Sequence, residues 1–215
     1  MEGARRLKPA RIEARATLLL LDYQWRFGII KSPPVPVDEI LEFLLKLHLE
    51  FADLRQDGFE GVVGITDTEA RRVVIDERLD PLSYPNMEGR FNFTVAHEIG
   101  HFYLQHPAIS SPTNNSHPSL VGSHQELEWQ ADKFASYLLM PKNMVVREWR
   151  AKFNHSDPLV ITPEMERAAL ANGFSRSDFV RAFAEERAGE LAPMFRVSVT
   201  AMRIRLQELG LLPRE

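Results

Sequence analysis

Two histidines and a glutamate in the segment His97-Glu98-Ile99-Gly100-His101 could hold and use a metal ion. Residues four apart on a helix are separated by about 40° around the axis and about 6 Å along it, so both imidazoles can reach one ion. Glu98 then lies beside that ion, where it could take a proton from the attacking water and give it to the leaving amine. The motif predicts metal-dependent hydrolysis, although so short a pattern also occurs by chance on amphipathic helices.

A catalytic zinc site needs three protein ligands, so the motif predicts another His, Asp or Glu. One candidate is His106, but on a continuing helix it is rotated by about 140° from His101 and cannot face the same ion. In metzincins a glycine bends the chain and the third histidine follows six residues after the second. Here those positions hold Leu104 and Pro107, so we reject His106 as a ligand.

The second candidate is Glu128, in a helical stretch that covers residues 128–141. Its carboxylate would complete a His-His-Glu site, and the Glu-x-x-x-Asp spacing is the gluzincin arrangement. Asp132, one turn later on the same face, could accept a hydrogen bond from a ligand histidine and fix its tautomer. Glu126 is a rival ligand, but its two-residue offset from Glu128 places it on a different face from Asp132.

The segment 107–122 joins these two motifs and carries three prolines, four serines and two asparagines, which favours a loop beside the cleft. His117 and His124 lie in or beside it. No helical spacing supports either as a ligand, so we interpret both as solvent-exposed loop histidines. No spacing places a residue that would stabilise an oxyanion, and Tyr137 and His155 are the remaining candidates for that role.

The two motifs together resemble the ImmA/IrrE-type metallo-endopeptidase family (domain of unknown function 955), a gluzincin-like group. That family has an Arg-Phe-x-Phe-Thr-like lead, a His-Glu-x-Gly-His helix and then Glu-x-x-Ala-Asn/Asp-x-Phe-Ala-x-x-Leu-Leu-Met-Pro. Residues 90–101 and 128–141 are similar to these patterns. Residues 34–40 are similar to the family's entry to its second helix, and residues 195–211 are similar to its C-terminal helical end, so the resemblance covers most of the chain.

The resemblance implies a zinc-dependent endopeptidase. His97, His101 and Glu128 would bind the ion, which could also be Mn²⁺ or another divalent cation. Glu98 would be the general base and acid, and Asp132 would orient a ligand histidine. The implied partner is a protein substrate, a helix-turn-helix repressor of the Xre type in a stress-response or mobile-element circuit. The chain shows neither the N-terminal DNA-binding domain nor the sensor domain of some relatives, so we expect a stand-alone protease.

Composition sets further limits on the class of protein. The 215 residues are 44% hydrophobic and 26% charged, which is ordinary for a globular protein. With no cysteine, a metal must be held by His, Asp and Glu. The apolar run at 18–21 is too short for a signal peptide or a membrane span, so we expect a cytoplasmic protein without a membrane partner. A net charge of −4 gives no general attraction to nucleic acid.

The expected fold class is α+β, with a mostly helical zincin-like core in residues 1–189 and helix-turn-helix-like helices in 190–215 packed on the same domain. Periodicity predicts helices at about 10–27, 38–46, 142–153, 163–172 and 175–188. Runs of β-prone residues predict a small antiparallel three-stranded sheet from segments 51–54, 61–66 and 72–76. An edge strand of this sheet could hold an extended peptide.

The C-terminal segment 191–206 supplies an alternative function. It resembles a helix-turn-helix, with Ser198 as a cap and Arg203 and Arg205 on the second helix. The alternative is therefore a DNA-binding or antitoxin-like regulator in which the metal site is structural. Arg196 occupies the turn position where such motifs usually carry glycine, and basic residues are few, so direct DNA binding is disfavoured.

Overall fold

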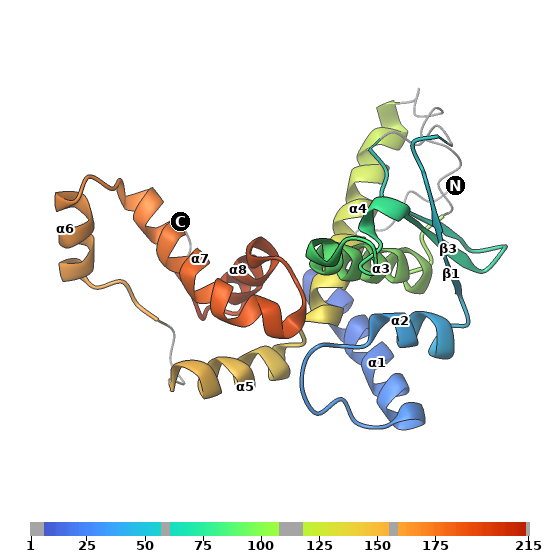
Figure 1. Ribbon diagram of the computed structural model, residues 1–215, viewed down its shortest axis with the longest axis horizontal. Coiled ribbons are helices and arrows are strands. Elements are labelled where there is room, and N and C mark those ends of the chain that lie inside the picture. Colours follow the sequence, from blue (N-terminus) through green and yellow to red (C-terminus); the bar gives the residue numbers. More distant parts are fainter. Residues whose placement is uncertain (1–6, 57–60, 108–117, 155–158, 214–215) are drawn as a thin grey trace. The chain divides into compact units, whose positions relative to one another are not determined.

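The computed structural model describes residues 7–56, 61–107, 118–154 and 159–213, and Figure 1 shows their helices and strands. The chain forms two compact units, Met1–Leu139 and Met140–Glu215. The first sequence motif lies in the first unit, the second crosses its border by two residues, and the C-terminal helices belong to the second unit. No helix in the described ranges is long and apolar enough to cross a membrane.

The first unit is built on three long helices. They are α1 (Pro9–Phe27), α3 (Glu88–Tyr103) and α4 (Pro118–Leu139). α1 matches the prediction closely: it buries Ile12, Ala16, Leu19 and Tyr23 and ends at Gly28, whose φ is 106°. Both α1 and α3 pack against α4, so α4 lies at the centre of the helical layer.

Two short segments of the first unit differ from the predicted helix and loop. The expected helix at 38–46 is a three-residue α-helix, α2 (Val37–Glu39), followed by a π-helical turn, η1 (Ile40–Leu44). The expected loop at 107–122 is wrong for its last part, because α4 already begins at Pro118. Proline is well tolerated at the first position of a helix, where no N–H is needed. Residues 108–117 of that loop lie outside the described residues.

The sheet has three strands in the order β1-β3-β2. β1 (His48–Ala52) runs parallel to β3 (Arg72–Asp76), and β2 (Gly64–Asp67) runs antiparallel to it. The prediction of an all-antiparallel sheet is therefore wrong for β1. Val73 and Ile75 of β3 are fully buried, which explains why β3 takes the centre and β2 becomes an edge. α3 packs against β2 and β3 on one side and against α4 on the other.

The second unit contains four helices. They are α5 (Lys142–Phe153), α6 (Pro163–Ala171), α7 (Arg176–Phe195) and α8 (Val199–Glu208). The first two match the prediction, whereas α7 continues past residue 188 and through the proposed boundary at 189/190. The side chains of Thr162 and Ser175 cap the starts of α6 and α7.

The turn between α7 and α8 has the predicted helix-turn-helix-like outline. Arg196 ends α7 in the left-handed region, with φ 49°, and Ser198 Oγ accepts a hydrogen bond from the Ala201 N–H at 3.1 Å. The side chain of Arg205 is only 2% exposed, and its Nε donates to the Met140 carbonyl at 3.0 Å. Arg205 therefore does not present its charge to a DNA phosphate.

Candidate metal centre

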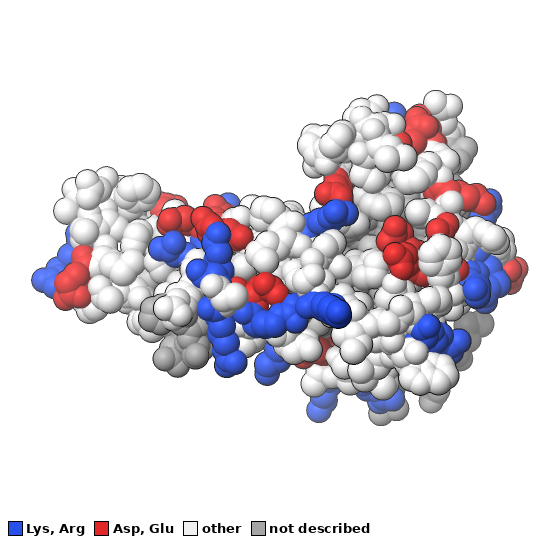
Figure 2. Space-filling model, turned by 60° about the horizontal axis from the view of Figure 1, so that its bottom comes forward, with Lys and Arg blue, Asp and Glu red and all other residues white. Residues whose placement is uncertain are grey.

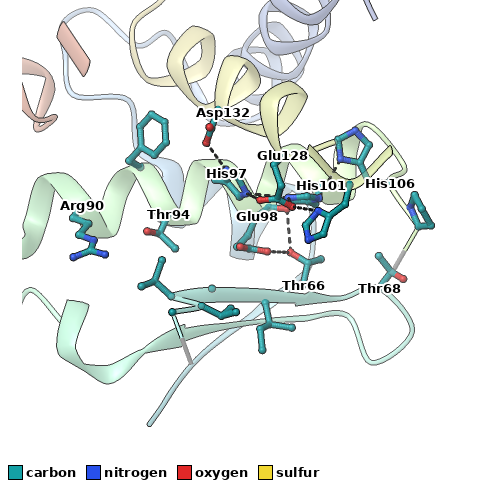
Figure 3. A pocket seen from close by; sticks show the side chains of 18 residues that line it. Thr66, Thr68, Arg90, Thr94, His97, Glu98, His101, His106, Glu128 and Asp132 are labelled. Atoms are coloured by element: carbon teal, nitrogen blue, oxygen red, sulfur yellow. Dashed lines mark hydrogen bonds and ion pairs between the residues drawn. The ribbon is translucent and has the colours of Figure 1, made fainter. Parts of the chain in front are cut away.

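Three side chains from α3 and α4 converge at one point of the first unit (Figure 3). His97, His101 and Glu128 each offer a ligand atom, and these atoms lie within 4.8 Å of one another. The two Nε2 atoms of the histidines are 2.9 Å apart. Glu128 places Oε2 3.3 Å from His97 Nε2 and Oε1 3.4 Å from His101 Nε2. The structure thus brings together the three residues that the sequence nominates as ligands.

The other ring nitrogen of each histidine has its own partner. His97 Nδ1 lies 2.9 Å from Asp132 Oδ1, where the sequence places an orienting carboxylate. His101 Nδ1 lies 3.1 Å from His106 Nδ1. Because both Nδ1 atoms are engaged, both Nε2 atoms are turned toward Glu128.

The arrangement fits a divalent cation. Zinc bound tetrahedrally at about 2.0 to 2.1 Å holds its ligand atoms roughly 3.3 Å apart. The separations from Glu128 to His97 and to His101 are 3.3 and 3.4 Å. Two imidazole nitrogens and a carboxylate oxygen form a donor set that suits zinc and also other divalent ions.

A close approach of α3 to α4 sets these distances. A Cβ on Gly100 would lie 3.2 Å from Ala131 Cα and 3.3 Å from Phe134 Cβ. Such contacts are tighter than ordinary van der Waals packing, so Gly100 allows the two helix backbones to approach closely. The spacing between the histidine pair and Glu128 depends on this contact.

Glu98 points to the other side of α3, toward the sheet. Its side chain is 6% exposed, and Thr66 Oγ1 on β2 donates to its Oε2 at 2.6 Å. A Cβ on Gly64 would lie 2.6 Å from Glu98 Oε1, so only glycine fits there. Sequence reasoning missed Thr66 and Gly64, because each is more than 30 residues from Glu98 and becomes its neighbour only through the packing of β2 on α3.

Protons are distributed unevenly across the cluster. Burial lowers the pKa of His97, but hydrogen bonds with Asp132 and Glu128 outweigh this effect and raise it to about 10. Burial and the nearby positive His97 lower the pKa of His101 to about 3. Burial opposes ionisation of Glu128, yet its hydrogen bond to His97 and the charges of both histidines keep its pKa below the usual value. In the metal-free protein at neutral pH, the His97 ring is therefore protonated, and its proton lies among the ligand atoms.

Burial also affects the proposed general base. It raises the pKa of Glu98, whereas the charge of His97 and the Thr66 hydrogen bond act in the opposite direction. A carboxylate with a raised pKa is better matched to proton transfer near neutral pH than an ordinary one. The buried position of Glu98 beside the cavity and its raised pKa suit it to proton transfer.

His106 contacts the cluster although it is not placed as a ligand. α3 stops at Tyr103, Gln105 adopts a left-handed φ of 60°, and the His106 N–H bonds to the His101 carbonyl at 2.9 Å. This reversal brings the His106 ring to Nδ1 of His101, away from Nε2. The argument from a continuing helix excluded His106 as a ligand, but it could not reveal this contact.

The prediction for His124 is wrong. His124 lies on α4, one turn before Glu128, with Nδ1 3.4 Å from Glu128 Oε1, and its side chain is one-third exposed. It therefore lines the site rather than an exposed loop. Of the other candidates, Glu126 is outside the ligand cluster found among the described residues, Tyr137 is buried, and His117 and His155 lie outside the described residues.

A cavity of about 450 Å³ opens beside the cluster. Its walls are β2 with the residues before it, one side of α3 and the middle of α4 (Figure 3). Thr66 and Thr68 border it on the strand side, and Arg90 and Thr94 border it on α3. The ligand cluster and Glu98 both face this space.

A His-Glu-x-x-His helix that packs between an edge strand and a second helix, with a glutamate of that helix beside the two histidines, is an arrangement suited to a metallopeptidase. The comparison with known families agrees: the sequence profile of the IrrE N-terminal-like domain, peptidase family M78, matches residues 65–207. Since the match covers more than half of the chain, the protein belongs to this family, as the two motifs indicated. No curated protein matched the sequence in a direct comparison.

Proposed function

We propose that this protein is a zinc-dependent endopeptidase. The observation that carries the proposal is the convergence of His97, His101 and Glu128 at a cavity that also contains the buried carboxylate of Glu98. These groups supply a metal site, a base and room for a peptide in one place. Family membership supports the same reaction class.

The site residues have distinct roles in the proposed hydrolysis. His97 and His101 would hold the ion through Nε2, and Asp132 and His106 orient the two rings through Nδ1. A bound zinc ion supplies a Lewis acid that polarises the scissile carbonyl and activates water. Glu98 takes a proton from the attacking water and returns it to the leaving nitrogen.

The edge strand β2 is the proposed binding site for the substrate backbone. Within the described part of the sheet, β2 pairs only with β3. Its residues also line the cavity next to the ligand cluster. An extended peptide can hydrogen-bond to the free edge of such a strand and so present one peptide bond to the site.

The proposed substrate is a helix-turn-helix repressor of the Xre type, whose cleavage releases stress-response or mobile-element genes. The resemblance of the two motifs to ImmA/IrrE-type proteins supports this assignment. A protease that cleaves a repressor would act in the cytoplasm, and a chain without cysteine is compatible with that compartment.

A zinc titration of metal-stripped protein tests the metal centre. Wild type should bind one tight equivalent of zinc, Glu128→Ala should bind it far more weakly, and the matched control Glu126→Ala should resemble wild type. Equal zinc binding by wild type and Glu128→Ala would show that Glu128 is not a ligand.

A cleavage assay tests the enzymatic activity. Zinc-loaded wild type and Glu98→Gln are incubated with purified Xre-type repressors, and new termini are identified by mass spectrometry. Loss of a general base lowers rates by about 10² to 10⁴, so we expect cleavage by wild type alone, with zinc retained in both proteins. Full cleavage by Glu98→Gln would refute the role of Glu98.

The alternative is a DNA-binding or antitoxin-like regulator in which the metal is structural, and the turn between α7 and α8 is what favours it. Arg205 is withdrawn from the surface, and Figure 2 shows acidic and basic side chains interspersed on the face it displays. A steep loss of DNA affinity with salt would support this alternative.

A further inference from the structure

One cation in the cavity lining has no partner among the residues that the structure describes. Arg90 on α3 is the only Lys or Arg among the described residues that line the cavity. Its side chain is exposed, and within the described ranges it takes part in no hydrogen bond, ion pair or ring contact. The acidic groups of the same lining are engaged, because Glu98 bonds to Thr66 and Glu128 faces the histidines. Among the described residues, Arg90 is therefore an unpaired charge, whereas the acidic groups of the same lining have partners.

The helix sets the spacing between Arg90 and the first residue of the ligand cluster, His97. Seven residues separate it from His97, which places the two on the same face of α3, about 20° apart and about 10.5 Å along the axis. Figure 3 shows Arg90 and Thr94 preceding His97 along this wall, with Thr68 toward the other end of the cavity. Arg90 thus lies at one end of the space that a peptide would occupy.

The direction of β2 relates this end of the cavity to the ends of a substrate. Gly64 contacts both Thr94 and Glu98, and Thr66 bonds to Glu98. Figure 3 shows Thr66 and then Thr68 toward the His101 end of α3, so β2 and α3 advance in the same direction. A peptide that pairs antiparallel to β2, the slightly more stable pairing, has its carboxyl end toward Arg90. An extended chain advances by about 3.3 Å per residue, so 10.5 Å corresponds to roughly three residues.

We propose that Arg90 selects substrates with an acidic side chain about three residues to the carboxyl side of the scissile bond. The inference rests on the proposed peptidase function and names the substrate class for it. A guanidinium pairs with a carboxylate through two parallel N–H donors, whereas it repels lysine or arginine at the same position. Because Arg90 has no structural partner in the described residues, removing its charge should leave the fold and the metal centre intact.

A positional peptide library tests the selection. Zinc-loaded wild type, Arg90→Gln and Arg90→Glu are given peptides with Asp, Asn or Lys at each position in turn, and products are quantified by mass spectrometry. Wild type should cleave the Asp peptide about two- to fivefold better than the Asn peptide at the third residue after the scissile bond, the upper part of the range for an exposed charge pair. Arg90→Gln should remove this preference, and Arg90→Glu should shift it to Lys. The control Arg26→Gln changes an arginine that pairs with Asp22 on α1 and should behave as wild type.

The outcomes separate this inference from the proposed function. Equal cleavage of the Asp and Asn peptides by wild type, an acid preference that survives in Arg90→Gln, or a preference on the amino side would overturn the role of Arg90. If zinc-loaded wild type cleaves no peptide and no repressor, the peptidase function fails. Binding of the same peptides to zinc-loaded Glu98→Gln, measured by fluorescence anisotropy, then shows independently whether Arg90 selects acidic peptides, and equal affinities for Asp and Asn would reject the selection too.

Discussion

Thr66 and Glu98 are joined by a hydrogen bond of 2.6 Å between the threonine hydroxyl and the glutamate carboxylate. Thr66 belongs to the edge strand β2, and Glu98 belongs to the helix that carries the histidine pair. The hydroxyl holds the carboxylate on the sheet side of α3, at the border of the cavity. The proposed base is thus positioned by the same strand that is proposed to bind substrate.

Thr66→Val should lower kcat while leaving zinc affinity unchanged. A hydrogen bond to a charged group contributes about 1.5 to 3 kcal/mol, and its loss frees the Glu98 carboxylate to leave its position, so we expect kcat to fall by about tenfold or more. Thr66→Ser should keep most of the activity. The control Thr68→Val lines the same cavity and should have little effect. A Thr66→Val protein with normal kcat would exclude a positioning role for the hydroxyl.

His106→Asn should weaken zinc binding without removing a ligand. The His106 ring contacts Nδ1 of His101, and loss of such a partner typically costs about 10- to 100-fold in metal affinity. Competition with a chelator measures this change. The control His48→Asn alters an exposed histidine of β1 and should bind zinc as wild type does. Unchanged affinity in His106→Asn would mean that the contact does not orient His101.

Gly64→Ala should destabilise the first unit and reduce activity. The added Cβ would lie 2.6 Å from Glu98 Oε1 and 2.8 Å from Thr94 Cγ2, and overpacking of this kind costs about 1 to 3 kcal/mol. Thermal unfolding measures the loss. The control Gly189→Ala on α7 meets no heavy atom within 4 Å and should be neutral or slightly stabilising, since alanine favours a helix. Full stability and activity of Gly64→Ala would contradict the close packing of β2 on α3.

Zinc affinity should rise with pH across the neutral range. In the metal-free protein, the pKa of His97 is raised to about 10, so its ring is protonated below that pH and zinc must displace the proton. The pKa of His101 and that of Glu128 are lowered, so neither group adds a proton in this range. One displaced proton increases the apparent affinity by about tenfold per pH unit between roughly pH 6 and 9. Calorimetric titration in buffers of different ionisation enthalpy measures the proton release, and a pH-independent affinity would contradict it.

The local part of the site could be predicted from the sequence. The spacing of His97 and His101 is a property of any α-helix, and Glu128 with Asp132 repeats the same geometry on a second helix. Their mutual distance could not be derived, because it depends on how α3 packs against α4. The expectation that the two motifs meet came from the family resemblance, and the structure brings these residues together as expected.

Contacts that depend on strand order could not be predicted. Hydrophobic patterns located β1, β2 and β3 approximately, but they do not state which strand is central. The sheet order β1-β3-β2 makes β2 an edge and brings Thr66 and Gly64 to Glu98. The contact of His106 was missed for a related reason. The prediction assumed that the helix continues, whereas α3 ends at Tyr103 and the chain makes a left-handed turn at Gln105.

The contact of Gly100 with Ala131 has a thermodynamic consequence. Because the histidine pair lies on α3 and Glu128 lies on α4, an ion held by all three fastens the two helices that form the centre of the first unit. Ligands that bind only the folded state shift the unfolding equilibrium by mass action, by about 2.7 kcal/mol at a free concentration 100 times Kd. Metal supply would then govern how long the first unit survives heat and proteolysis as well as whether it can hydrolyse a peptide.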